Sequence, residues 1–434
     1  MTDDFGSIWE VYGLRTDPFT TSPILVKGGL VLPESFTGRA EEVKRLEKIF
    51  RSTGGSRSIV FGRPGVGKTT LVNIVRSKAL EKGFFTPFKE IKADADWQVD
   101  DFLINTLSAI YASLIKDEKP SLQVRKQIDK LKVILDAYEK EDVGYSATVG
   151  IVGGGISKSR TINRPELSAD YLTNLFEEVI AALISSGYRE VIIHYNNLDS
   201  FDEEEEKLKR LFNRIRDVLQ TPNVHFVFVG SAITTAVITS LPRVASILTD
   251  TPIPLSSLSL VDVKSIVHKR VVGAAIQEMK SVDMTTDEAI ETLYHLHTGD
   301  LRAILNSLST AVREVTGEKP IQLTDEVLRS VLYEISQKRF SQKITPTEGE
   351  VLMEMLKQGE STNTGLAASL KKKPQNVSKY LATLKDASCI YLIRTDGREK
   401  YYSVAEWIRW LSLKPNMPVA EDKKYRNIDL SEYV

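Results

Sequence analysis

The sequence predicts an α/β protein with a parallel β-sheet in its N-terminal half and a mainly helical C-terminal half. An apolar run at 58–61 leads into a glycine-rich turn and then into an amphipathic helix. Two further apolar, β-prone runs follow at 191–195 and 223–230, whereas residues 260–337 repeat apolar positions at helical spacing. Strands that alternate with helices indicate a parallel sheet, and short continuous apolar runs are typical of its buried strands.

The composition indicates a folded protein of several domains. At roughly 100 to 200 residues per domain, a chain of 434 residues with 42% hydrophobic content supports more than one core. No apolar run reaches the ~18 residues of a membrane helix, and the opening MTDDFGSIWE lacks the basic-then-apolar order of a signal peptide. We therefore expect a cytoplasmic protein without a membrane partner, associated with the nucleoid if it binds DNA. The single Cys389 excludes an internal disulfide, and the five histidines show no metal-ligand spacing.

The turn after the first apolar run has the pattern of a phosphate-binding loop. In SIVFGRPGVGKTTLVNIV an expected strand precedes the loop and an expected helix follows it, which a chance glycine-rich turn would lack. Glycines let successive N–H groups turn toward a phosphate, and the positive end of the helix dipole points at the same anion. Lys68 would reach the β- and γ-phosphates of ATP, and the Thr69 hydroxyl would bind Mg²⁺. The residues expected to hold these two cofactors are Gly62, Pro64, Gly65, Val66, Gly67, Lys68, Thr69 and Thr70.

Two further motifs flank this core. FTGRAEEVKRLEKIF opens a helix before it, and HTGDLRAILNSL follows it. In this order around the loop, the motifs resemble those of AAA+ ATPases, particularly the branch of archaeal and eukaryotic origin-recognition and helicase-loader proteins. The resemblance spans about 36–410. It implies that Arg39 lies at the adenine side and that Arg302, in a helical lid, touches the γ-phosphate. Taken alone, TGD is also typical of a helix end followed by a cap, and Arg302 of a solvated side chain.

The strand at 191–195 ends unusually, in VIIHYNNLDSF. In the AAA+ pattern an aspartate here orients Mg²⁺ through water and the next glutamate polarises the attacking water, but this chain has Asn196 and Asn197. An amide oxygen can still contact a magnesium-bound water, although it supplies no negative charge and accepts no proton. We therefore expect a weak ATPase at most, and Asn197→Glu should raise its rate. Asp199 cannot take the place of Asn196 on a strand, but it could reach the site from the following loop. The run 202–206 is expected to form the solvated first turn of a helix.

The third apolar run ends at Ser231. AAA+ proteins keep a polar sensor at this position, but a residue that simply ends a strand would look the same. Downstream, where the family often carries an arginine finger, this chain has Ile247 or Leu248, with only Arg243 nearby. Activation by a neighbouring subunit of a homo-oligomer is therefore doubtful, although an oligomer or a protein partner stays possible.

An insert separates the loop from the second apolar run. Residues 143–162 alternate apolar and polar positions around Gly153-Gly154-Gly155, which favours a β-hairpin. Lys158 and Arg160 would share one face of it. That face could contact DNA or a partner, but an ordinary structural hairpin is the simpler interpretation.

The last 90 or so residues predict a winged helix-turn-helix. Three helical segments are followed by two strands around Asp396-Gly397, a strong hairpin signal. Residues 361–400 hold eight basic and three acidic residues, a difference of +5 in a chain of net charge −1, which favours double-stranded DNA as the partner over protein contacts alone. The residues expected to contact DNA are Lys373, Gln375, Asn376, Ser378, Lys379, Arg398 and Lys400.

These interpretations combine into an AAA+ core, a helical lid and a C-terminal winged-helix domain. The expected limits are an N-terminal extension at 1–35, the core at 36–254, the lid at 255–340, the winged helix at 341–412 and a tail at 413–434. The expected catalytic residues are Lys68, Asn196, Asn197, Asp199, Ser231 and Arg302, with Thr69 and Asn196 at the metal. The leading hypothesis is an ATP-controlled DNA-binding protein. The alternatives are a signalling or defence ATPase of the STAND type, which would carry sensor repeats after the winged helix, and a nucleotide-responsive transcriptional regulator.

Overall fold

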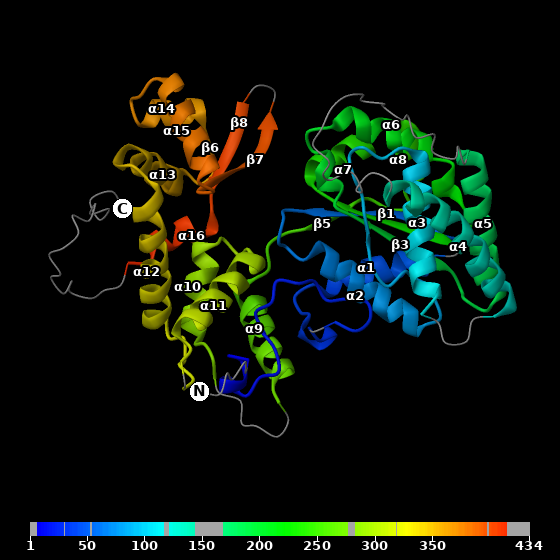
Figure 1. Ribbon diagram of the computed structural model, residues 1–434, viewed down its shortest axis with the longest axis horizontal. Coiled ribbons are helices and arrows are strands. Elements are labelled where there is room, and N and C mark those ends of the chain that lie inside the picture. The colour runs from blue at the N-terminus through cyan, green and yellow to red at the C-terminus, as the bar shows by residue number, and fades with distance from the viewer. Residues whose placement is uncertain are drawn as a thin grey trace, which may run out of the picture. The chain divides into compact units, whose positions relative to one another are not determined.

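The computed structural model describes residues 7–29, 31–52, 54–116, 121–143, 168–276, 283–317, 319–396 and 399–414. The chain forms two compact units (Figure 1). The sheet unit comprises Pro23–Gly29 and Arg39–Ser256, and the lid unit comprises Met1–Ser22, Leu30–Gly38 and Ser257–Val434. Across the described ranges, no helix is both long and apolar enough to cross a membrane.

A parallel β-sheet is the framework of the sheet unit. Within the described residues it has five strands in the order β2-β3-β4-β1-β5, and every neighbouring pair is parallel. The strands are β1 (Ser56–Gly62), β2 (Ile91–Lys92), β3 (Val191–Asn196), β4 (Val224–Gly230) and β5 (Ile253–Leu255). The predicted α/β fold with a parallel sheet is confirmed. Because the strands are parallel, their carboxyl ends share one edge of the sheet.

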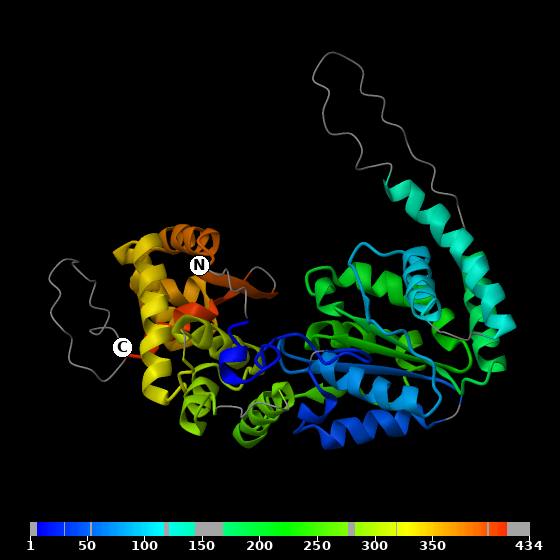
Figure 2. The same cartoon turned by 60° about the horizontal axis from the view of Figure 1, so that its bottom comes forward.

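Helices cover both faces of this sheet. They are α1 (Ala40–Phe50), α2 (Lys68–Glu81), α3 (Val99–Leu114), α4 (Leu122–Val143), α5 (Ala169–Ser185), α6 (Glu205–Ile215), α7 (Ala232–Thr239) and α8 (Pro242–Ala245). Ile193 and Tyr195 of β3 join the apolar core with α3, α5 and α6, whereas His194 faces Asn73 and Arg76 of α2. Both faces of this strand are therefore covered, one by apolar side chains and the other by the polar side chains around His194. Figure 2 shows α1 and α2, in blue, on one side of the sheet and the cyan and green helices on the other.

The predicted hairpin insert lies almost wholly outside the described residues. Helix α4 ends at Val143, and the described chain resumes at Ser168, which caps α5. The expectation for Lys158 and Arg160 therefore stays a prediction.

Among the described residues, four helices form the lid region of the second unit. They are α9 (Leu260–Ala274), α10 (Asp287–Leu296), α11 (Leu301–Val315) and α12 (Asp325–Lys343). Each begins at a side chain that accepts a backbone hydrogen bond of the first turn, and these caps are Ser259, Thr286, Asp300 and Thr324. The N-terminal segment packs into the same core through Trp9, Tyr12, Leu14 and Phe19. The Tyr12 hydroxyl donates to the carbonyl of Ile321 at 3.0 Å, so this segment is part of the lid's structure.

A smaller α/β module follows the lid. We call residues 346–409 the C-terminal module; its elements are α13 (Pro346–Gln358), β6 (Ser361–Thr362), α14 (Asn363–Ser369), α15 (Pro374–Asp386), β7 (Ile390–Asp396), β8 (Glu399–Val404) and α16 (Glu406–Arg409). Its described strands form an antiparallel sheet in the order β6-β8-β7. Thr345 and Glu348 form a capping box that starts α13. Val377, Leu381 and Leu384 attach α15 to the module's core.

The lid and the C-terminal module share buried side chains. Trp410, only 2% exposed, belongs to the lid core, and its Nε1 donates to Ser307 Oγ of α11 at 3.0 Å. Asn306 Nδ2 of the same helix donates to Glu406 Oε2 of α16 at 2.9 Å. Helices α11 and α16 are therefore joined directly by side-chain hydrogen bonds.

Candidate nucleotide site

The predicted phosphate-binding loop joins β1 to α2 at the carboxyl edge of the sheet. Gly65 and Gly67 have φ of 82° and 93°, a left-handed conformation that other residues adopt at a cost. Gly67 precedes α2, no described side chain caps that helix, and a Cβ on Gly67 would project into open space. The N–H groups of the first turn therefore face outward without a competing side-chain acceptor. This arrangement fits a bound phosphate.

Lys68 lies beneath this loop and is 8% exposed. Its Nζ donates to the carbonyls of Gly62 at 2.7 Å and Arg63 at 3.1 Å, and it lies 3.6 Å from Asp199 Oδ2. The ammonium group is thus held between the loop and the chain that follows β3. A cation at this point would neutralise phosphate charge in the loop.

Thr69 and Asn196 meet across the gap between α2 and β3. Thr69 Oγ1 donates to Asn196 Oδ1 at 3.3 Å, so the two predicted metal residues are brought together. In the described chain no three His, Cys, Asp or Glu side chains form a metal-binding cluster. Mg²⁺ keeps several waters and binds through few protein oxygens plus phosphates, so a hydroxyl and an amide oxygen fit it without such a cluster. A bound Mg²⁺ would supply charge neutralisation at the phosphates, with Thr69 as ligand and Asn196 contacting a bound water.

The second asparagine of the pair points elsewhere. Asn197 has φ of 66°, is exposed, and donates through Nδ2 to the carbonyl of Ala93, just beyond β2, at 3.4 Å. Its left-handed backbone turns the chain sharply out of β3. This contact does not support the expectation that Asn197 faces the phosphates.

Asp199 returns to the site through this turn. It lies in the 3₁₀ helix η3 (Leu198–Phe201), whose Leu198 and Phe201 are both buried. Asp199 Oδ2 faces Lys68, whereas Oδ1 is buried and has no hydrogen-bond partner within the described residues. Burial raises the pKa of the Asp199 carboxyl, although the neighbouring Lys68 lowers it. The alternative that Asp199 reaches the site from the loop thus matches its position.

Asp202 is a site residue that the sequence did not identify. Ser231 Oγ, at the end of β4, donates to Asp202 Oδ1 at 2.5 Å and accepts from the backbone N–H of Thr234 at 3.1 Å. Burial raises the pKa of Asp202, Ser231 lowers it, and the nearby Asp199 raises it further. The expected solvated turn begins later, because α6 starts at Glu205. Only the adjacency of β3 and β4 brings these side chains together.

Arg39 braces the loop from within the protein. Its guanidinium is 4% exposed and donates to the carbonyl of Val66 at 3.3 Å and to that of Ser256. It also pairs with Glu42 at 3.2 Å. These contacts join the loop to the start of α1 and to the chain after β5. The predicted contact with adenine stays a prediction.

Arg302 belongs to the lid unit. It is the second residue of α11, its side chain is exposed, and its backbone N–H is capped by Asp300 Oδ1 at 2.9 Å. The described contacts therefore match the simpler interpretation, a helix cap followed by a solvated arginine, and the contact of Arg302 with the γ-phosphate stays a prediction.

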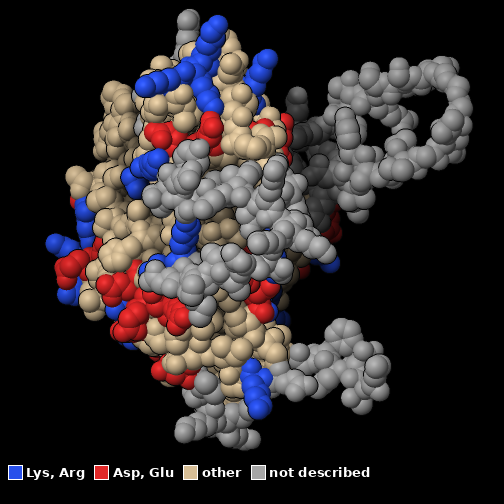
Figure 3. All heavy atoms as spheres, turned by 90° about the vertical axis from the view of Figure 1, so that its left-hand side faces the viewer, with Lys and Arg blue, Asp and Glu red and all other residues tan. Residues whose placement is uncertain are grey.

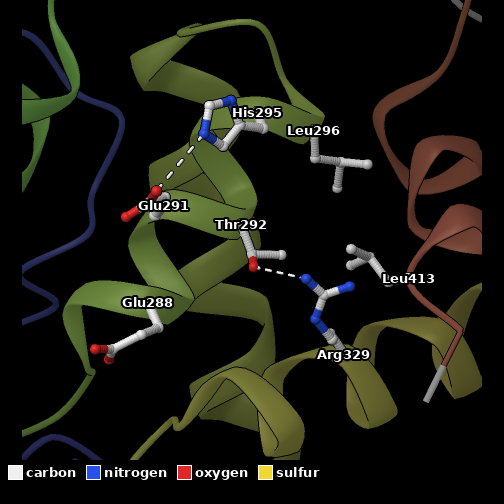
Figure 4. Close-up of a pocket in the computed structure, with 7 residues that line it drawn as sticks. All are labelled: Glu288, Glu291, Thr292, His295, Leu296, Arg329 and Leu413. Carbon is white, nitrogen blue, oxygen red and sulfur yellow. Dashed lines mark hydrogen bonds and ion pairs between the residues drawn. The ribbon is translucent and has the colours of Figure 1, made fainter. Parts of the chain in front are cut away.

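A cavity of about 490 Å³ also lies in the lid region, between α10 and α12. Figure 4 shows its lining, in which Arg329 points at Thr292 and His295 at Glu291. Arg329 Nη2 donates to Thr292 Oγ1 at 2.9 Å, and its Nε pairs with Asp325 at 2.7 Å. The cavity contains none of the predicted site residues, and its arginine is already paired with lid side chains.

The C-terminal module presents a polar helix face to solvent. Gln375, Asn376, Ser378 and Lys379 of α15 are all exposed, while Val377 between them is buried. Lys373, at the start of α15, and Lys400 of β8 are exposed too, whereas Arg398 lies outside the described residues. In Figure 3 Lys and Arg side chains project at the top of the view, the end at which Figure 1 draws α14 and α15. The predicted contact residues of α15 thus share one accessible surface.

These features define a class of protein. A glycine-rich loop between a central parallel strand and a helix, with Lys68 and Thr69 at the helix start, is the site of a P-loop nucleotide-binding protein. Residues 35–228 match the family described as AAA ATPase domain. The match covers the loop, β3 and nearly all of β4. A search of curated proteins found no match to the sequence.

Several solved structures resemble the whole chain. ORC2 of Aeropyrum pernix, in ADPNP–ADP complexes, has a TM-score of 0.46 at 13% identity, covering 89% of this chain and 96% of its own. ORC1 of Aeropyrum pernix, in complex with DNA, has a TM-score of 0.41 at 16% identity, covering 94% and 97%. Cdc6p of Pyrobaculum aerophilum has a TM-score of 0.41 at 14% identity, covering 92% and 97%. Because these TM-scores are all below 0.5, the likenesses carry no functional argument. The functional proposal below therefore depends on the residues of this chain.

Proposed function

We propose that this chain is an ATP-binding protein that binds double-stranded DNA through its C-terminal module, with the nucleotide acting as a conformational switch. The observation that carries the proposal is the exposed polar face of α15 in a chain whose residues 35–228 match the AAA ATPase domain family. Helices α14 and α15 and the β7–β8 hairpin follow the element order of a winged helix-turn-helix. In such a module α15 enters the major groove.

The side chains on this surface have chemistry suited to DNA. The amides of Gln375 and Asn376 match the paired donor and acceptor of adenine, and both lie on the first turn of α15. Lys373 and Lys379, at the same end of the helix, suit phosphates, which position a protein without reading sequence. Lys372 contributes less, because it is paired with Glu350 at 2.5 Å.

The switch would act through α11. Arg302, at the start of this helix, would contact the γ-phosphate, and Asn306 and Ser307 further along it bind Glu406 and Trp410. A displacement of α11 caused by ATP would therefore reach the C-terminal module through side chains that are already in contact. A switch of this kind needs ATP binding and tolerates slow hydrolysis, as expected where Asn196 and Asn197 replace the usual acids.

Anisotropy titrations of a labelled duplex with the full chain test the DNA-binding part. Lys373→Ala with Lys379→Ala should weaken binding to any duplex and flatten the log–log salt dependence by roughly 0.9 for each phosphate that the variant no longer neutralises. Lys357→Ala is the matched control, because Lys357 is exposed on α13 of the same module but lies off α15. Equal affinity and salt slope in the double variant and the control would contradict the proposal.

A further inference from the structure

The turn that ends β3 places a carboxylate beside Lys68, the lysine of the phosphate-binding loop. Asn196 and Asn197 cannot accept a proton, yet Asp199 Oδ2 lies 3.6 Å from Lys68 Nζ. Asn197 makes this possible, since its left-handed backbone, φ 66°, redirects the chain into η3. The negative charge absent from the strand end is thus supplied from the following helical turn.

The position of Asp199 is fixed by packing on both sides. Leu198 is 2% exposed and Phe201 is 1% exposed, so η3 is anchored before and after the carboxylate. Gly230, the last residue of β4, lets η3 approach closely. A Cβ there would lie 2.6 Å from Thr234 Oγ1, 3.0 Å from Leu198 Cβ and 3.5 Å from Asp199 Oδ1. A side chain at 230 would therefore crowd Thr234 and Leu198, the residue that precedes the carboxylate.

The two oxygens of Asp199 have different surroundings. Oδ2 faces Lys68, whereas Oδ1 is buried and without a hydrogen-bond partner in the described part of the chain. A buried carboxylate oxygen is costly unless something donates to it. Asp202 does not share this feature, because its Oδ1 accepts from Ser231. Asp199 is therefore the acid with acceptor capacity left beside Lys68.

We propose that Asp199 is the catalytic base of this ATPase site and orients the attacking water. The inference rests on the proposed function, since it needs ATP in the loop. The water oxygen forms a bond to the γ-phosphorus while a water proton moves to the Asp199 carboxylate. The bond from the γ-phosphorus to the β–γ bridging oxygen breaks, and its electron pair leaves with ADP. The products are ADP and phosphate, and the proton then passes from Asp199 to solvent.

Reach, and not basicity, is what we expect to limit this base. Burial raises the pKa of the Asp199 carboxyl and so makes it a stronger proton acceptor, although the neighbouring Lys68 acts in the opposite direction. Aspartate is one methylene shorter than the usual glutamate and reaches the site from η3 instead of the strand end. Turnover below ~1 s⁻¹, the low end of ordinary enzymes, is the expected result.

The test compares wild type, Asp199→Asn and Asp217→Asn as full chains. Phosphate release is measured in single turnover, together with the affinities for mant-ATP and for ADP with aluminium fluoride, which imitates the transferring phosphoryl group. Asp199→Asn should release phosphate about 100-fold more slowly, the lower range for loss of a general base, and bind the fluoride complex more weakly. Its affinity for mant-ATP should stay within about threefold or tighten, since the substitution removes a negative charge near the phosphates. Asp217→Asn is the matched control, because Asp217 is an exposed aspartate of the same unit that pairs only with Arg216 and Gln220 among its described contacts, and Asp199→Glu should restore part of the rate.

Three results would overturn the inference. They are a wild-type rate in Asp199→Asn, an unchanged affinity of that variant for the fluoride complex, and no phosphate release by the wild type above buffer alone. Mant-ATP binding shows that each variant is folded. If the wild type itself binds no mant-ATP, the proposed function fails first, and Asp199 is then no base either.

Discussion

Thr69 Oγ1 donates to Asn196 Oδ1 across 3.3 Å, so the hydroxyl expected to bind magnesium is already directed at the end of β3. In our interpretation of the sequence, this neutral amide takes the place of a carboxylate in the AAA+ pattern. The amide preserves the hydrogen bond but contributes no charge toward a divalent cation.

Asn196→Asp should therefore strengthen the magnesium dependence of ATP binding. The added charge lies close to the cation's expected position, and the affinity for ATP with Mg²⁺ should rise several-fold relative to ATP with EDTA, because charge interactions at a partly buried site are worth about 1 kcal/mol or more. Asn197→Asp is the control, since Asn197 is exposed and bonded toward Ala93. An equal effect of both substitutions would show that residue 196 has no special relation to the metal.

Lys68→Ala should abolish ATP binding or weaken it about 10- to 100-fold, the range expected for loss of a charge-assisted hydrogen bond. Titration calorimetry with ATP and Mg²⁺ measures this directly. Lys78→Ala removes a lysine from the same helix that is paired with Glu47 at the surface, and it should bind ATP like the wild type. Equal calorimetric affinities of the wild type and Lys68→Ala would refute a phosphate-binding role for the loop.

Asn376→Ala should cost ~1–3 kcal/mol on a duplex selected for tight binding and little on random duplex, because a bidentate amide–adenine contact carries sequence information. Thr383→Ala, further along the exposed side of α15, is the control; Thr383 donates only to the carbonyl of Lys379. Competition titrations with both duplexes measure the difference. A uniform loss on both would indicate that Asn376 positions the helix without reading bases.

Glu406 predicts a pH dependence of the contact between lid and module. Its pKa is raised from the ordinary 4.5 to about 7, mainly by burial and in smaller part by Asp300, while Asn306, Ser307 and Arg409 oppose the rise. Between about pH 4.5 and pH 7, the folded state therefore keeps Glu406 protonated, whereas the unfolded chain releases this proton. Its contribution to stability is complete below about pH 4.5 and disappears as the pH rises to about 7.

Glu406→Gln should remove this pH dependence. Between pH 5.5 and pH 8, the free energy of unfolding of the wild type should fall by roughly 2 kcal/mol more than that of Glu406→Gln. The urea midpoint of the variant should fall correspondingly less. Tryptophan fluorescence follows the transition, because Trp410 is buried beside Ser307. Glu326→Gln, exposed on α12, should show the wild-type pH dependence. Parallel curves for all three proteins would mean that Glu406 titrates as an ordinary glutamate.

Local patterns in the sequence predict the elements of this fold well. The loop from Gly62 to Thr69 needs left-handed glycines between a strand and a helix, and those requirements are visible in the letters themselves. The start of α15 at Pro374 follows likewise from the fixed φ of proline and its missing N–H.

Contacts between distant segments could not be predicted in this way. The Ser231–Asp202 hydrogen bond depends on the sheet order, which makes β3 and β4 neighbours. The brace formed by Arg39 joins Val66 and Ser256, which only the folded sheet unit brings close. The left-handed backbone at Asn197 decides where Asp199 lies. Asparagine tolerates this conformation but does not require it, so the sequence gives only a weak signal of the turn.

The effect of ATP on DNA affinity tests the central claim most directly. Anisotropy titrations of a selected duplex with the full chain, in ATP with Mg²⁺ and without nucleotide, should differ by at least about fivefold, the lower range of coupling between two sites. Lys68→Ala and Arg302→Ala should both remove the difference while keeping the affinity measured without nucleotide. Identical affinities of the wild type with and without ATP, under conditions where calorimetry shows ATP bound, would contradict the account of a nucleotide-controlled DNA-binding protein.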